Sequence, residues 1–215
     1  MSTLTVDLPA RLVQSGKYPG MNKPADYFAR TNIFKTWYKP TTLEHKSQEK
    51  AISKWLSDLN PEHTLELGPG LGRITQLVVN KHPGIALTLV DVNKNYFSEL
   101  RIKFPHVTLV EANVEKYKFG KNKYDLVVAT ELLVHISDIE KLVDKVHASL
   151  TDGGTFITSI TPDTWYVKNR SGVHNLDRGI NKQEFEEFVS QNFYIEDIHQ
   201  DRNGHFTTYR LTKNS

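Results

Sequence analysis

Apolar residues follow two different periodicities along this chain. Between about residues 41 and 60 they recur three or four residues apart, which predicts one face of a helix that begins after Pro40. Beyond residue 61, short runs that are almost continuously apolar alternate with helix-like stretches. Such runs are typical of parallel strands that are buried on both faces of a sheet. The predicted strands span residues 63–67, 85–90, 107–110, 124–129 and 155–160.

The segments that follow most of these strands predict helices. They cover residues 72–80, 93–103, 139–150 and 182–191, and Asp138 is a suitable N-cap for the third. Repeated strand–helix units with short connections favour an α/β fold, with a parallel sheet and helices on both faces. The end of the chain differs, because strands at 194–198 and 206–211 flank Asn203-Gly204, a hairpin signal. We therefore expect an antiparallel pair at the end of a mostly parallel sheet.

Two segments lack this alternation. Residues 1–40 contain little periodicity apart from a helix that Pro24 would open, so we expect an N-terminal arm and lid helix there and the main domain over 41–215. The second segment, residues 161–177, includes His174. Long irregular loops on such sheets often carry specificity.

Composition narrows the range of functions. A chain of 215 residues with 38% hydrophobic residues is expected to form one domain with a real core. The net charge of +2 gives little reason to expect a nucleic-acid partner. The lack of cysteine excludes disulfides, thiolate metal sites and a cysteine nucleophile. With no long apolar run and no signal-peptide pattern at the N-terminus, we expect a cytoplasmic location without a membrane partner.

A glycine-rich turn joins the strand 63–67 to the next helix. From Glu66 to Gly72 the sequence is E-L-G-P-G-L-G. Glycines allow backbone conformations and close approaches that a Cβ forbids, and the first N–H groups of a helix lack partners, so a polar ligand fits there. Arg73 takes the place of the third glycine of a dinucleotide fingerprint, and no P-loop Lys-Ser or Lys-Thr pair follows. A tight turn without a ligand is the alternative.

The E-x-G-x-G-x-G pattern resembles motif I of the class I S-adenosylmethionine-dependent methyltransferases. With the strand-end residues and the antiparallel ending, the resemblance covers about residues 41–213. It implies a Rossmann-like fold with a seven-stranded, mostly parallel sheet, a C-terminal antiparallel hairpin and helices on both faces. It also implies S-adenosylmethionine as cofactor. The residues expected to bind it are Glu66, Gly68, Gly70, Gly72, Asp91, Val92, Asn113, Val114 and Thr130.

Three of these polar residues have a structural alternative. Asp91 would accept hydrogen bonds from the ribose hydroxyls, or it would cap the following helix. Asn113, where the family more often has aspartate, would face the adenine or form a turn. Glu66 would meet the cofactor's ammonium, or it would pair with Arg73 or a lysine, because a buried carboxylate is costly unless it is satisfied.

Two histidines are candidate general bases. His135 follows the strand 124–129 in the segment T-E-L-L-V-H-I, and His174 lies in the irregular loop. An imidazole titrates near neutral pH and can take a proton from an attacking oxygen or nitrogen. The alternative for His135 is a structural role beneath the cofactor loop.

The acceptor is less clearly indicated than the cofactor. The segment after the strand 124–129 lacks the motif of the amino-group methyltransferases, and the acidic and amide metal ligands of the catechol-methylating branch are not evident, so no metal is expected. We expect O- or N-methylation of a small-molecule or metabolite acceptor, and a homodimer is compatible with the sequence. The alternatives are a protein or peptide acceptor, or an inactive cofactor-fold subunit. A nicotinamide dehydrogenase is disfavoured by Arg73.

Overall fold

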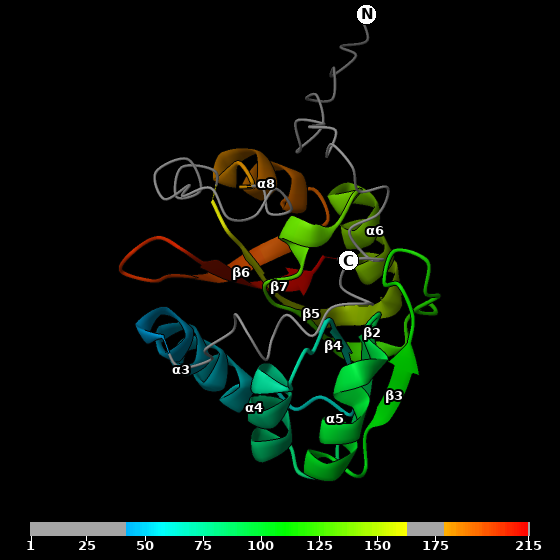
Figure 1. Cartoon of the computed structure of the whole chain (residues 1–215). Helices are drawn as coiled ribbons and strands as arrows, with labels where there is room; N and C mark the ends of the chain where they lie inside the picture. Colours follow the sequence, from blue (N-terminus) through cyan, green and yellow to red (C-terminus); the bar gives the residue numbers. More distant parts are fainter. Residues whose placement is uncertain (1–41, 163–178, 215) are drawn as a thin grey trace, which may run out of the picture.

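The computed structural model describes residues 42–162 and 179–214, which form one sheet with helices on both faces (Figure 1). The expected arm and lid helix within residues 1–40, and the loop that contains His174, lie outside the described residues. The seven strands follow the order β3-β2-β1-β4-β5-β7-β6. Their bounds are β1 (His63–Leu67), β2 (Ala86–Asp91), β3 (Thr108–Glu111), β4 (Tyr124–Ala129), β5 (Leu150–Ile160), β6 (Phe193–Gln200) and β7 (Thr207–Lys213).

The helices form two layers, and each layer covers its own hydrophobic core. In the described part these are α3 (Leu43–Ser57), α4 (Arg73–Lys81), α5 (Phe97–Lys103), α6 (Ile139–Ser149) and α8 (Lys182–Val189), with short 3₁₀ helices η1 (Lys94–Tyr96) and η2 (Leu133–His135). Helices α3, α4 and α5 lie on one side of the sheet and α6 and α8 on the other (Figure 1). Because successive strand residues point to opposite faces, Leu126 and Val128 of β4 join the first core and Val127 and Ala129 the second.

The strand directions confirm the expected topology. Strands β1 to β5 run parallel, β7 pairs antiparallel with β5, and β6 pairs antiparallel with β7. The chain builds outward from β1 through β2 to β3 and then returns to place β4 on the other side of β1. The carboxyl ends of these strands meet at the edge where the winding reverses, which is where open α/β sheets bind ligands.

The structure differs from the sequence prediction at several element boundaries. Strand β5 begins at Leu150, directly after α6, ahead of the predicted start at residue 155, and Gly153 (φ +71°) lies in an irregularity inside that strand. The helix expected over 93–103 is divided into η1 and α5, and the side chain of Asn93 caps η1 by accepting from the Asn95 N–H. Strand β2 extends to Asp91, so this carboxylate belongs to the last residue of the strand.

Helix α3, at the start of the described residues, contacts the hairpin at their end. Thr42 caps the helix, since its hydroxyl accepts from the His45 N–H. On β6, Asp197 accepts from the indole N–H of Trp55 at 2.8 Å, and Gln48 donates to the hydroxyl of Thr208 on β7 at 3.2 Å. Polar contacts therefore tie α3 to the last hairpin. No helix of the described part is long and apolar enough to cross a membrane.

Candidate functional site

A pocket opens where the ends of β1, β2, β3 and β4 meet. Its walls come from four segments that are distant in sequence but adjacent at this edge of the sheet. They are the glycine turn after β1, the end of β2 with η1, the loop after β3, and the loop after β4 that includes η2. The lining residues are Gly68, Gly70, Asp91, Val92, Asn93, Tyr96, Ala112, Asn113, Val114, Glu115, Glu131, Leu132, His135 and Ile136.

The three glycines of the turn all adopt left-handed backbone conformations, but they face different neighbours. Gly68 (φ +67°) and Gly70 (φ +55°) line the pocket. Gly72 (φ +83°) does not, because it faces the end of α5, where an added Cβ would lie 2.5 Å from the ring of Phe104. The motif glycines thus divide between the pocket and helix packing, and Gly72 belongs to the packing.

Asp91 connects the glycine turn to the end of β2. Its carboxylate accepts from the N–H of Gly70 at 3.2 Å and from the N–H of Asn93 at 2.8 Å. Burial raises the pKa of this carboxyl, and the backbone hydrogen bonds oppose the rise. A carboxylate offers about four lone-pair sites, so the two bonds leave capacity for hydroxyl donors in the pocket. Asp91 therefore lines the pocket and caps the backbone that follows β2.

The loop after β3 contributes Asn113 and Val114 to the pocket, and Val92 joins them from the end of β2. The side-chain oxygen of Asn113 accepts from the Glu115 N–H at 2.8 Å, so this residue also forms the turn that was its alternative. Thr130, the residue after β4, is not among the lining residues. His135 lies in η2 and lines the pocket.

Glu66 lies beneath the pocket and does not line it. Its carboxylate accepts from the hydroxyl of Thr75 on α4 at 2.7 Å, a partner that sequence reasoning missed. Arg73, one of the expected partners, forms ion pairs with Glu49 and Glu131. Burial raises the pKa of Glu66 to about 7, while the Thr75 hydrogen bond and the Arg73 charge act in the opposite direction.

This raised pKa predicts a pH-dependent stability. Folded Glu66 holds its proton up to about pH 7, whereas the unfolded side chain loses it near its ordinary pKa of 4.5. The free energy of unfolding should therefore fall as the pH rises from about 4.5 to 7. Glu66→Gln keeps an acceptor for Thr75 but cannot titrate, so it should lose this dependence of stability on pH. As the pH rises to 8, the variant should therefore gain stability relative to the wild type by up to about 3 kcal/mol. Urea unfolding at pH 5 and pH 8 measures the effect; equal slopes for both proteins would contradict it.

Glu131 is a pocket residue that sequence reasoning missed as a candidate. It is a non-glycine residue with φ +56°, and its N–H donates to the hydroxyl of Ser159 at 2.8 Å. Its carboxylate bonds the guanidinium of Arg73 and lies 3.4 Å from Nε2 of His45. An acidic residue directly after a strand was the only local signal, because the partners come from α3 and α4.

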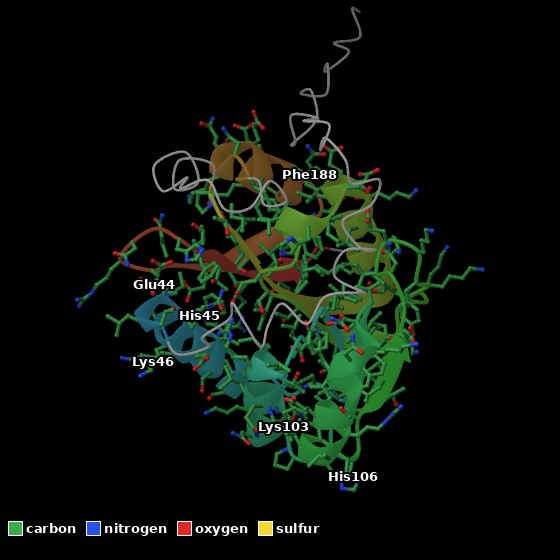
Figure 2. The ribbon with its side chains drawn as sticks, viewed as in Figure 1. Glu44, His45, Lys46, Lys103, His106 and Phe188 are labelled. Atoms are coloured by element: carbon green, nitrogen blue, oxygen red, sulfur yellow. The ribbon has the colours of Figure 1, made fainter. Side chains whose placement is uncertain are left out.

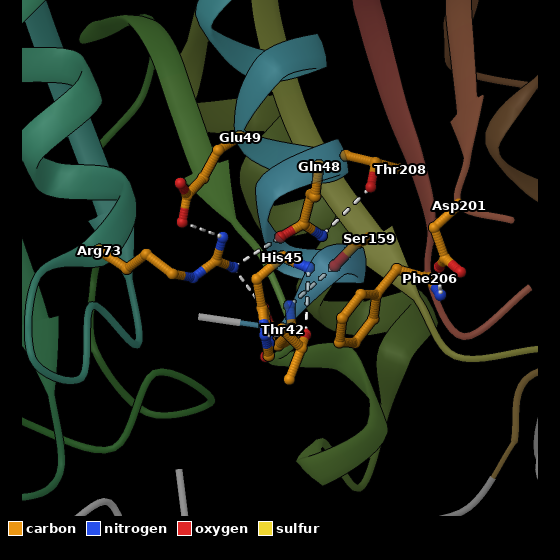
Figure 3. Close-up of polar contacts among 10 residues, drawn as sticks. Thr42, His45, Gln48, Glu49, Arg73, Ser159, Asp201, Phe206 and Thr208 are labelled. Atoms are coloured by element: carbon orange, nitrogen blue, oxygen red, sulfur yellow. Dashed lines mark hydrogen bonds and ion pairs between the residues drawn. The ribbon is translucent and has the colours of Figure 1, made fainter. Parts of the chain in front are cut away.

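Arg73 also reaches α3 (Figure 3). Its guanidinium donates to Glu49 at 3.2 Å and to Gln48 at 2.5 Å. Figure 2 shows His45, between Glu44 and Lys46, on the first turn of α3, far from the Lys103 and His106 end of the molecule. The polar contacts around Arg73 therefore join α3, α4 and the loop after β4.

A metal site is not evident at this pocket. Across residues 42–162 and 179–214, no group of three or more histidine, aspartate or glutamate side chains is arranged to hold an ion. The expectation that no metal is required stays a prediction.

Comparison with known proteins identifies the family. Residues 65–156, which span β1 to β5 and include every lining residue of the pocket, match a family model described as a methyltransferase domain. This chain carries a methyltransferase domain. The fold expected from the sequence is confirmed, and the match agrees with the family that the sequence resembles.

The curated relatives of this methyltransferase domain share limited identity with it. One is malonyl-[acyl-carrier protein] O-methyltransferase 2 of Ilyobacter polytropus, 25% identical over 62% of this chain and 50% of that protein. Another is malonyl-[acyl-carrier protein] O-methyltransferase of Priestia megaterium, 25% identical over 44% of this chain and 35% of that protein. The chain spans about half or less of the length of the curated relatives it matches.

Solved structures share the fold of the methyltransferase domain. The N-methyltransferase NodS of Bradyrhizobium japonicum, in complex with S-adenosyl-L-homocysteine, superposes with a TM-score of 0.70 at 13% identity, covering 89% of this chain and 97% of that one. A possible histamine N-methyltransferase of Thermotoga maritima gives 0.65 at 18% identity, covering 89% and 100%.

Proposed function

We propose that this protein transfers a methyl group from S-adenosylmethionine to an oxygen or nitrogen of a small-molecule acceptor. The observation that carries the proposal is the position of Asp91. Its carboxylate ends β2, is tied to the glycine turn by the N–H of Gly70, and faces the same pocket as Asn113. A buried carboxylate beside left-handed glycines and an amide side chain suits a nucleoside with free ribose hydroxyls.

The described residues fit this cofactor. Asp91 would accept from the ribose hydroxyls, and Asn113 with Val114 would hold the adenine. The glycine turn and the loop after β4 would then bind the methionine end of the cofactor. When bound, S-adenosylmethionine supplies a methyl group whose bond to sulfur breaks as the acceptor's lone pair forms the new bond. The protein has no need of a nucleophile of its own, since holding the two reactants in line is worth about 7–11 kcal/mol in favourable cases.

Calorimetry on the full chain tests the cofactor assignment directly. We expect S-adenosylmethionine to bind, and NADH to give no heat of binding, since Arg73 stands where a dinucleotide fingerprint has glycine. Binding of NADH alone would refute the proposal. An untargeted metabolite screen with labelled cofactor would then identify the acceptor. Cofactor binding without turnover on any pool would favour the inactive subunit.

His135 is the described candidate for a general base. It lines the pocket from η2, and a hydroxyl or ammonium acceptor must lose a proton as it is methylated. His135→Ala should lower turnover on such an acceptor by about 10²-fold or more and change the cofactor affinity little. His106→Ala, at an exposed position between α5 and β3, is the matched control. Unchanged turnover would leave His135 with a structural role only. His174, the second candidate, stays a prediction outside the described residues.

A carboxyl group carried on an acyl carrier protein is the second candidate acceptor. The names of the curated relatives favour it. A carboxylate already presents a lone pair, so its methylation needs no general base and would be insensitive to His135→Ala. Incubation of labelled cofactor with malonyl-acyl carrier protein, and with free malonate as control, separates this acceptor from small metabolites. The cytoplasmic location and the homodimer stay predictions.

A further inference from the structure

Glu131 has an unusual backbone conformation at the wall of the pocket. Its φ of +56° lies in a region that residues other than glycine rarely adopt, and such conformations persist only where the surroundings hold them. Here the N–H of Glu131 donates to Ser159 on β5, while Arg73 and His45 contact its carboxylate. Backbone and side chain are thus fixed independently, and together they determine where the negative charge lies.

Glu131 shares its partner Arg73 with a second carboxylate. Arg73 pairs with both Glu131 and Glu49, and Nε2 of His45 lies 3.4 Å from the Glu131 carboxylate. The side chains are 12%, 21% and 28% exposed for Arg73, Glu131 and Glu49, so solvent screens them less than it screens surface ions. The carboxylate of Glu131 is therefore fixed at the pocket wall in a partly screened environment.

Glu131 lies at one end of the pocket. In the strand order, the loop after β3 is at the opposite end, and Asp91 and the glycine turn come between. This step depends on the proposed function: with adenosine held by Asp91 and Asn113, the sulfur side of the cofactor falls toward β1 and β4. There Leu132 packs within 3.0 Å of the Cβ position of Gly68, next to Glu131.

We propose that the carboxylate of Glu131 makes the pocket prefer the positively charged S-adenosylmethionine over its product, S-adenosylhomocysteine. The two molecules differ by one methyl group and the positive charge on sulfur, so a nearby fixed anion stabilises the donor and not the product. Arg73 and His45 act as positioning residues that hold this anion. When the methyl group is transferred, the sulfur becomes neutral and this attraction is lost. S-adenosylhomocysteine is therefore held less tightly than S-adenosylmethionine.

Calorimetry of both ligands on the full chain tests the inference. Glu131→Gln should lower the ratio of S-adenosylmethionine affinity to S-adenosylhomocysteine affinity by about tenfold. Glu115→Gln is the matched control, because Glu115 also lines the pocket but lies after β3, with its carboxylate bonded to Ser137. The ratio should be unchanged in this control. An equal fall in both variants would overturn the assignment to Glu131.

A second variant covers the case in which Glu131→Gln does not fold. Asparagine tolerates the left-handed backbone better than glutamine, so Glu131→Asn removes the charge with less strain. Thermal unfolding with each ligand shows which variants are folded. An unchanged affinity ratio in a folded variant would overturn this inference and leave the proposed function intact. A wild-type chain that binds neither ligand would refute the proposed function itself.

Discussion

Replacement of Asp91 by alanine is expected to weaken S-adenosylmethionine binding by about 1–3 kcal/mol, measured by calorimetry. Two effects add. The variant loses charged acceptors at the pocket wall, and it releases the N–H of Gly70, which fixes the glycine turn against β2. Because the carboxylate is buried beside the pocket, water restores only part of either contact.

The neighbouring strand offers a matched control. Glu111 is the register partner of Asp91 at the end of β3, but it is exposed and pairs loosely with Lys94 at 3.9 Å. Glu111→Ala should leave the cofactor affinity unchanged. Asp91→Asn, which keeps the shape and one acceptor oxygen, should fall between the wild type and Asp91→Ala. An unaltered affinity in Asp91→Ala would exclude the ribose role.

Substitution of Gly72 by alanine is expected to lower the free energy of unfolding by about 2–4 kcal/mol. The backbone at φ +83° is strained for any residue with a Cβ. The added methyl would also lie 2.5 Å from Cε2 of Phe104 and 2.9 Å from Cδ2 of Leu100. Urea unfolding, with the denaturation midpoint as readout, measures the loss.

Gly84 provides a control that separates the backbone strain at Gly72 from the clash of the added methyl group with α5 and Phe104. It has nearly the same backbone conformation, φ +84°, but no heavy atom lies within 4 Å of its Cβ position. Gly84→Ala should therefore show only the conformational cost, about 1–2 kcal/mol. If the two alanine variants were equally destabilised, the packing of Gly72 on α5 would contribute nothing.

Much of the sheet is predictable because burial on both faces leaves a strong local signal. Strands β1 and β4 occur at the residues that their apolar runs predict. The early start of β5 is not predictable in this way, because only Leu150 pairs with β4 there and the polar or glycine residues 151–154 lie in the irregularity before the next pair at Thr155. Hydrogen bonds between backbones depend little on the side chain, so the sequence pattern does not record them.

The residues of the site likewise include some that the sequence pattern predicts and some that depend on packing. Asp91 and Asn113 are found at the pocket because each follows a predictable strand, and parallel strands bring their carboxyl ends to one edge. The pairing of Glu131 with Arg73 spans 58 positions in sequence and depends on how α4 packs beside the loop after β4. The partner of Glu66 likewise follows from the orientation of α4, which places Thr75 toward β1.

The attachment of α3 to the last hairpin bears on how the protein matures during synthesis. Trp55 precedes its partner Asp197 by 142 positions, and Gln48 precedes Thr208 by 160. At about 5–20 residues per second, the indole of Trp55 leaves the ribosome roughly 7–30 s before Asp197 is available. During that interval the indole of Trp55 and the amide of Gln48 lack these hydrogen-bond partners. Truncation before β6 would remove both partners permanently, and incompletely folded nascent chains are clients for chaperones.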